Sequence, residues 1–251
     1  MRGYAEEVES VVEPVRVARR RSRWLRWLGT MLVVAGVAGL AWAFVTWQWN
    51  DPITALYTRW QQGRLEHQYE AVVRRERQHL PVAPPKADRE ELQAAVATAA
   101  RRYRATAPQG SAIGRIVVPR LGLNMILVNG TDTGTLKRGP GRDLRTFMPG
   151  QGQLVYIAGH RTTYLAPFAH IDRLEPGDRV SLELPYATFV YRVTGHRIVE
   201  ADDLSVLQSH GREVVALQAC HPRFFATHRY IVWAVPVKVT PHGGPSFRPV
   251  R

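Results

Sequence analysis

The chain has 251 residues, of which 45% are hydrophobic and 22% are charged. This composition supports a folded core and excludes a wholly disordered or fibrous protein. The length fits one domain with additional segments, or two small domains. The formal net charge is +13, but the basic residues are spread along the chain without an aromatic-interleaved stripe, which argues against nucleic-acid binding.

The first predicted element is a membrane-spanning helix. Residues 27–50 contain no charged side chain, and tryptophans stand near both ends of this stretch. At about 1.5 Å per residue, it is long enough to cross a hydrocarbon core of about 30 Å. Six arginines lie between positions 16 and 26, immediately before it. The positive-inside rule therefore predicts that residues 1–26 are cytoplasmic and that the chain after residue 50 is external.

A cleaved signal peptide is the main alternative to this anchor. The tripeptide Ala41-Trp42-Ala43 fits the small-x-small pattern of a cleavage site. However, the apolar run continues to Trp47, as in an uncleaved anchor. We therefore expect a single-pass membrane protein whose N-terminal helix contacts lipid.

Two helices are predicted between the span and the next domain. Residues 53–80 are rich in helix formers and end before the first of several prolines, Pro81. Residues 88–103 have a second helical pattern, with Asp88 placed as its N-cap. Because both segments are rather polar, we interpret residues 51–110 as an extracellular stalk.

From residue 111 onward, the pattern becomes that of an all-β domain. Short runs rich in β-branched residues alternate with Gly, Pro and Asp turn signals, and no long amphipathic helix intervenes. Seven or eight short strands in about 130 residues indicate a closed barrel or a sandwich. We assign this domain to residues 111–240 and expect residues 241–251 to form a flexible tail. The predicted strands are 113–118, 125–128, 154–158, 179–184, 188–199, 214–219 and 230–239.

Cys220 is the single cysteine of the chain. On the predicted topology it lies outside the cell, where thiols are normally paired, yet it has no partner within the chain. It is therefore a buried inert thiol, one half of an intermolecular bridge, or a reactive nucleophile.

The surroundings of Cys220 favour a nucleophile. The strand ending at Cys220 is followed by a short loop, and Arg229 opens the next strand. If these strands pair antiparallel, Arg229 stands beside Cys220, where a guanidinium favours the thiolate and could hold an oxyanion. His160, at the end of the strand 154–158, is a candidate general acid or base.

Two motifs identify the chain as similar to the sortase family. They are IAGHRTTYLAPFAHIDRLEPGD, which begins at Ile157, and LQACHPRFFATHRYIVWA, which begins at Leu217. The upstream segment that begins at Ile113 resembles the start of the same domain, so the resemblance covers residues 112–239. It implies a closed eight-stranded β-barrel and a cysteine transpeptidase that cuts a C-terminal sorting signal and transfers the protein to an amine.

The resemblance also assigns site residues. His160 matches the catalytic histidine, Cys220 the nucleophile and Arg229 the active-site arginine. The stretch from His160 to Tyr164 is similar to class E sortases of high-GC Gram-positive bacteria, in which the tyrosine is associated with an LAxTG-type signal in place of LPxTG. The expected substrate contacts are Tyr164, Arg161, Ala219 and His221.

The expected partners are secreted proteins with a C-terminal sorting signal and an amine of a peptidoglycan precursor, with no nucleic acid, metal or other cofactor. The segment before the nucleophile departs from the family pattern TLxTC, because the sequence is Ala216-Leu217-Gln218-Ala219-Cys220 and the hydroxyl just before the nucleophile is absent. This departure keeps open a non-catalytic wall-binding module. An exported cysteine peptidase that uses water as acceptor is the second alternative.

Overall fold

The computed structural model describes residues 19–49, 52–78 and 87–249. The chain divides into two compact units between residues 48 and 49. The first unit is represented by helix α1 (Arg19–Trp49), in which the window Arg23–Phe44 has 22 residues and a mean hydropathy of 1.8. None of this window is buried, so α1 has the length and composition of a membrane-spanning helix and not the packing of a core helix. Parts of the predicted cytoplasmic segment, the span, the stalk and the tail lie outside the described residues.

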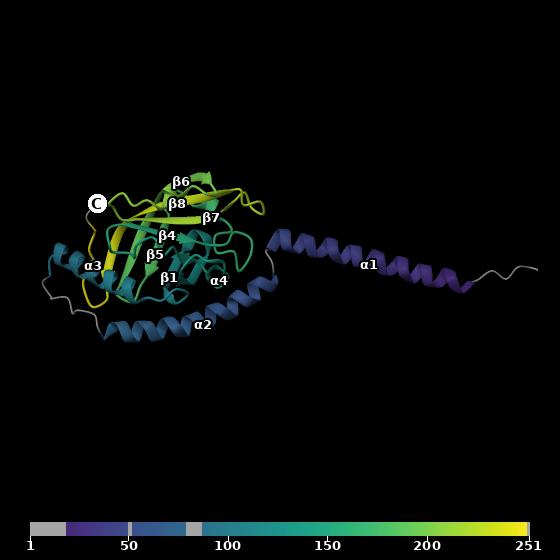
Figure 1. Ribbon diagram of the computed structural model, residues 1–251, viewed down its shortest axis with the longest axis horizontal. Coiled ribbons are helices and arrows are strands. Elements are labelled where there is room, and N and C mark those ends of the chain that lie inside the picture. The colour runs from purple at the N-terminus through teal and green to yellow at the C-terminus, as the bar shows by residue number, and fades with distance from the viewer. Residues whose placement is uncertain (1–18, 50–51, 79–86, 250–251) are drawn as a thin grey trace, which may run out of the picture. The chain divides into compact units, whose positions relative to one another are not determined.

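Eight strands in the described part of the second unit close into a barrel, as the sequence predicts (Figure 1). Their order around the barrel is β1-β2-β3-β4-β7-β8-β6-β5. The strands are β1 (Ala112–Val118), β2 (Leu123–Asn129), β3 (Gly141–Arg142), β4 (Leu154–Ala158), β5 (Arg179–Glu183), β6 (Ala187–Glu200), β7 (Val214–His221) and β8 (His228–Pro241). Short helical turns connect them: η1 (Pro119–Leu121), α4 (Thr133–Leu136), η2 (Ile171–Arg173) and η3 (Leu204–Leu207).

Strand β3 is the one barrel strand that the sequence pattern does not predict. It has only two residues and bridges β2 and β4, pairing parallel with the former and antiparallel with the latter. Its Arg142 is 2% exposed, and its guanidinium donates hydrogen bonds to the side chain of Asn129 and the carbonyl of Thr146. These hydrogen bonds compensate for the burial of the guanidinium charge between strands β2 and β4.

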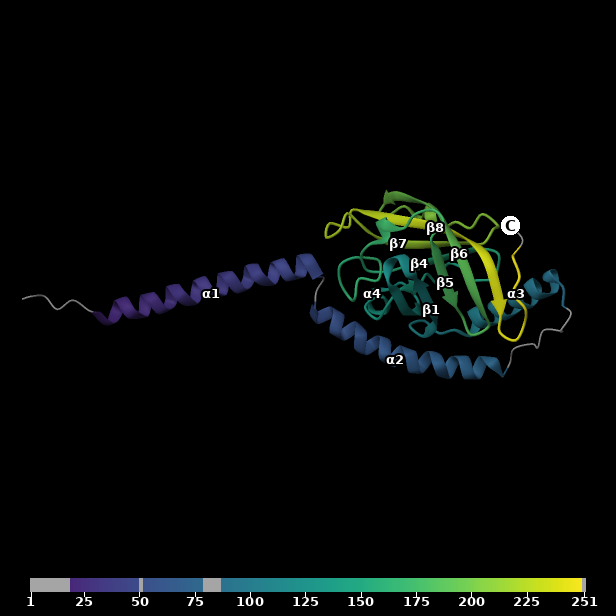
Figure 2. The same cartoon turned by 180° about the vertical axis from the view of Figure 1, so that it is seen from behind.

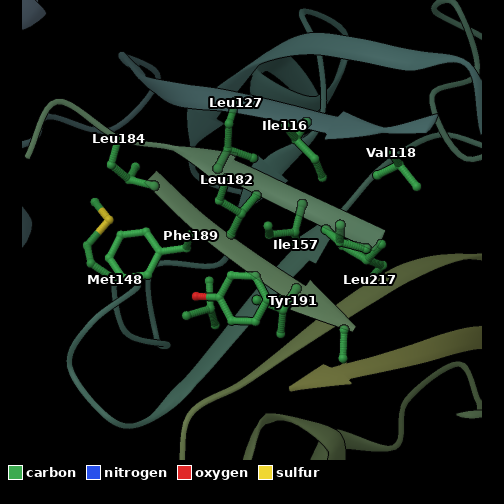
Figure 3. Close-up of a cluster of buried hydrophobic side chains, with 14 of the residues drawn as sticks. Ile116, Val118, Leu127, Met148, Ile157, Leu182, Leu184, Phe189, Tyr191 and Leu217 are labelled. Carbon is green, nitrogen blue, oxygen red and sulfur yellow. The ribbon is translucent and has the colours of Figure 1, made fainter. Parts of the chain in front are cut away.

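The interior of the barrel is filled by every second side chain along each strand, the ones that point inward. Ile157 of β4, Leu217 of β7 and Leu182 of β5 are fully buried and belong to one apolar cluster, and Figure 3 shows them together with Phe189 and Tyr191. Because strand side chains alternate between faces, the neighbours of these residues point to the outer face. This alternation decides which side chains of β4, β7 and β8 can meet a substrate.

Helices α2 (Pro52–Arg77) and α3 (Arg89–Thr106), in the segment predicted as a stalk, pack on the barrel (Figures 1 and 2). The polar side chains of α2 bond to the barrel: the Gln62 amide donates to the carbonyl of Arg138 at 2.7 Å and accepts from the Ile126 amide at 2.7 Å. Polarity in this segment therefore serves attachment as well as solvation. Helix α3 begins as predicted, with Asp88 as its N-cap in a capping box.

The predicted flexible tail is attached to the barrel at Phe247. Phe247 forms an antiparallel bridge with Val239 of β8, with both hydrogen bonds at 2.9 Å. Phe247 is 8% exposed and belongs to the main apolar cluster. Burial of an aromatic ring explains why this segment is ordered at Phe247 although it follows the last strand.

Candidate active site

The end of β7 brings Cys220 and Arg229 together. Strands β7 and β8 pair antiparallel, and Cys220 is the direct partner of Arg229 in the register. This pairing confirms the juxtaposition expected from the sequence. Both side chains are partly exposed, so a substrate can reach the thiol and the guanidinium.

The alternation of β7 separates Cys220 from the residue before it. Ala219 is fully buried in the main apolar cluster, whereas Cys220 lies on the outer face of the barrel. The side chain of Ala219, which the sequence predicts as a substrate contact, therefore packs in the core. A methyl group fits this apolar position without a hydroxyl that would need a partner.

His160 is delivered to the same end of the barrel by β4. Strands β4 and β7 are parallel neighbours, with Ala158 paired to Gln218, and the Gly159 amide donates to the Gln218 carbonyl at 3.0 Å. His160, two residues past the end of β4, therefore lies at the same end of the barrel as Cys220, two residues past Gln218. The Nε2 atom of His160 is buried and has no hydrogen-bond partner among the described residues. A buried nitrogen without a partner is costly in a purely structural histidine and useful in a proton-transfer group.

Burial lowers the pKa of His160 below its ordinary value of 6.5, and the positive charge of Lys137 lowers this pKa further. Both causes disfavour the imidazolium and favour the neutral ring. Lys137 lies just after α4, and its Nζ is 5.9 Å from the centre of the Tyr164 ring. The sequence pattern does not single out Lys137, which is one of 34 basic residues and lies outside the motifs that carry His160 and Cys220.

Replacing Lys137 with glutamine is expected to raise the pKa of His160, because a positive charge that opposes the imidazolium is removed. The pKa should remain below the ordinary histidine value, since burial is the larger cause. NMR titration of the histidine rings measures the change. Lys238→Gln removes a lysine that is exposed on β8 and serves as the control. An unchanged His160 titration in K137Q, or an equal change in K238Q, contradicts this account of the site.

Arg161 is buried beneath the end of the nucleophile strand, and His221 is partly exposed next to Cys220. Arg161 is 5% exposed; its Nη2 is 2.9 Å from a carboxylate oxygen of Asp172, and its Nη1 donates to the Cys220 carbonyl at 3.3 Å. The same Nη1 lies 2.9 Å from Nδ1 of His221. Arg161 therefore ties the end of β7 to the loop after β4. Sequence reasoning placed Arg161 near the site and missed this bracing role.

Arg229 is itself held in position by its backbone neighbours. Its Nη1 donates to the carbonyls of Ala226 at 2.8 Å and His228 at 2.9 Å. Within the described part of the chain, its Nε and Nη2 groups make no hydrogen bond. A guanidinium fixed at one nitrogen can thus present its remaining donors to an oxyanion.

Tyr164 borders the candidate histidine. Its ring centre is 5.0 Å from that of His160, and the two planes are tilted by 40°. Tyr164 therefore lies against the ring of His160, and its contact with a substrate remains a prediction. The arrangement combines a thiol, an imidazole, a guanidinium and an aromatic rim at one end of the barrel.

Comparisons with known proteins agree with this arrangement. A family model described as the sortase domain matches residues 116–237. Sortase D of Bacillus subtilis is 31% identical over 128 residues, which cover 49% of this chain and 63% of that protein. Sortase SrtE1 of Streptomyces coelicolor is 32% identical over 108 residues, which cover 39% of this chain and 31% of that protein. The matches thus span less than two thirds of the length of either curated relative.

A comparison with solved structures also indicates similarity to sortases. The crystal structure of sortase E1 from Streptomyces coelicolor with a tripeptide in the active site is similar to this chain with a TM-score of 0.50. The two are 27% identical, and the match covers 54% of this chain and 94% of that one. Because the family model, the relatives and the barrel coincide on the segment that carries His160, Cys220 and Arg229, the chain belongs to the sortase family.

Proposed function

We propose that this chain is a membrane-anchored cysteine transpeptidase that cleaves an LAxTG- or LPxTG-type sorting signal between Thr and Gly and transfers the protein to a cell-wall amine. The observation that carries this proposal is the register of β4, β7 and β8, which gathers His160, Cys220 and Arg229 at one end of the barrel. The family membership supports transpeptidation in general.

The first chemical step is attack by the Cys220 sulfur on the threonine carbonyl. The thiol proton passes to the neutral ring of His160, and the carbonyl π electrons move to oxygen. The Nε and Nη2 groups of Arg229 then donate to the resulting oxyanion. Because these groups are already oriented by the bonds of Nη1, little reorganisation accompanies the step.

His160 completes both halves of the reaction. The imidazolium protonates the glycine nitrogen, the Thr–Gly bond breaks, and a thioester forms between the threonine carbonyl and Cys220. The incoming amine attacks this thioester and loses a proton to His160, and the cysteine sulfur departs. The partner is an amine of a peptidoglycan precursor, and water in its place gives hydrolysis.

Tyr164 is proposed as the residue that favours LAxTG over LPxTG. Its ring stands beside His160, so a peptide that reaches Cys220 and His160 would pass close to it. The similarity to SrtE1 and to the class E motif supports this assignment. Because the side chain of Ala219 faces the core, its difference from threonine does not alter the exposed surface of the site, and this supports a catalytic role over a non-catalytic wall-binding module.

A transfer assay tests the function. The full chain is incubated with LAxTG and LPxTG peptides and a small amine acceptor, and the products are separated by chromatography. We expect a transfer product in which the amine replaces the glycine, with LAxTG used faster. Cleavage without transfer at saturating amine would favour the exported peptidase instead.

The anchor orientation is a separate part of the proposal. The arginines before residue 27 and the apolar α1 support a single span with the N-terminus in the cytoplasm. A periplasm- or exterior-active reporter fused after Tyr103 should be active, and a cytosol-active reporter at the same site should be silent. The reverse pattern contradicts the topology, and recovery of the mature chain without residues 1–43 indicates a cleaved signal.

A further inference from the structure

The loop that leaves β4 has an unusual backbone beside the candidate histidine. Three consecutive residues other than glycine adopt positive φ angles: 53° at Tyr164, 62° at Leu165 and 41° at Ala166. The left-handed region crowds the Cβ atom of an L-residue, so single non-glycine residues visit it rarely and runs of them more rarely still. Such a segment keeps its conformation only where its surroundings hold it.

The start of α2 contacts this loop at both backbone and side chain. The Tyr164 amide donates to Oγ1 of Thr54 at 2.9 Å, across 110 positions of sequence. The ring of Tyr57 meets the ring of Tyr164 edge-on, with centroids 6.3 Å apart. Because the Tyr164 ring in turn lies 5.0 Å from the His160 ring, α2 is one side chain removed from the reacting groups.

Helix α2 is itself fixed to the barrel at the same place. Thr58 is fully buried, and its hydroxyl donates to the Lys137 carbonyl at 3.0 Å. One turn later, Gln62 bonds to Arg138 and Ile126. The helix thus holds the backbone of both Lys137 and Tyr164. The Nζ atom of Lys137 in turn lies over the ring of Tyr164.

We propose that the first turns of α2 are a positioning element of the active site, in which Thr54 and Tyr57 hold the loop after β4 so that Tyr164 stays against His160. Neither residue touches substrate; each acts through Tyr164. Both lie outside the segment 116–237 that matches the sortase domain, so the barrel alone is an incomplete catalytic unit. The kinetic part of this inference rests on the proposed function, and the structural part does not.

Amide exchange tests the structural part on the full chain in detergent micelles. Thr54→Val keeps the β-branched shape and removes the acceptor, so the Tyr164 amide should exchange about five- to tenfold faster, the range expected for one hydrogen bond. The ring resonances of His160 should also move, because the neighbouring aromatic ring shifts. Thr54→Ser retains the hydroxyl and should behave like the wild type. His67→Ala, exposed on the same helix, is the matched control.

Kinetics test the consequence for the site. In T54V and in Tyr57→Leu, kcat/KM should fall about five- to tenfold and the ratio of LAxTG to LPxTG turnover should change, while Tm stays the same; T54S should restore both values. An unchanged exchange rate of the Tyr164 amide in T54V overturns the inference. It is also overturned if this amide exchanges faster in T54V while the kinetics of an active enzyme stay those of the wild type. A wild type without transferase activity refutes the proposed function, and the exchange and His160 resonances then decide the positioning role alone.

Discussion

Replacing Cys220 with alanine is expected to abolish transfer of a sorting peptide to an amine. The chain contains a single cysteine, so no other thiol can form the acyl-enzyme. Because the Cys220 side chain is partly exposed and small, the free energy of unfolding should change by less than about 1 kcal/mol. The assay is chromatographic detection of the transfer product, with thermal unfolding measured in parallel.

Cys220→Ser separates nucleophilicity from shape. The hydroxyl occupies nearly the same volume but is a far weaker nucleophile without a strong base, so this variant should also fall below detection. A folded C220A protein that still forms the transfer product would show that another group performs the chemistry, and the sortase-type mechanism would then be wrong for this chain.

Replacing Arg229 with lysine is the second change with a large expected effect. Lysine keeps the charge but lacks the planar fork that lets Nη1 bond to two carbonyls while other donors face the oxyanion. Loss of one oriented oxyanion donor costs about 10²–10³ in kcat, and we expect R229K to lose a similar factor. Steady-state kinetics should show the loss mainly in kcat, since the missing interaction forms in the transition state.

Arg197→Lys provides a control for this substitution, because Arg197 is exposed on β6. R197K should retain the kinetics of the wild type. If R229K keeps kcat and raises only KM, Arg229 binds the substrate uniformly and does not stabilise the oxyanion. Wild-type kinetics in R229K would remove Arg229 from the mechanism altogether.

Much of the barrel and the pairing of Cys220 with Arg229 could be predicted from local sequence patterns. The strand pattern at 154–158 predicts β4, and two strands separated by a short loop predict the β7–β8 pairing. Strand β3 could not be predicted, because two residues carry no periodicity. The sequence also predicts that His160 follows the end of the strand 154–158, as it follows β4 in the structure. The catalytic roles of His160, Cys220 and Arg229 remain predictions for the experiments above.

The remaining features depend on contacts between distant parts of the chain. Nothing in the sequence around Thr54 indicates that its hydroxyl accepts a bond from Tyr164, 110 positions away. The polar stripe of α2 has the composition of a solvated helix, although Thr58 is fully buried. Similarly, Ala219 is recognised as a core residue only when the register shows which face of β7 is inside.

The most direct test of the central claim is intact-mass analysis of the full chain after brief mixing with an LAxTG peptide. The account predicts a covalent adduct on Cys220 with the mass of the peptide up to and including threonine, less one water. Addition of an amine acceptor should discharge this adduct and release the amide product. Absence of any adduct while the peptide is consumed, or an adduct that persists in C220A, would contradict the account.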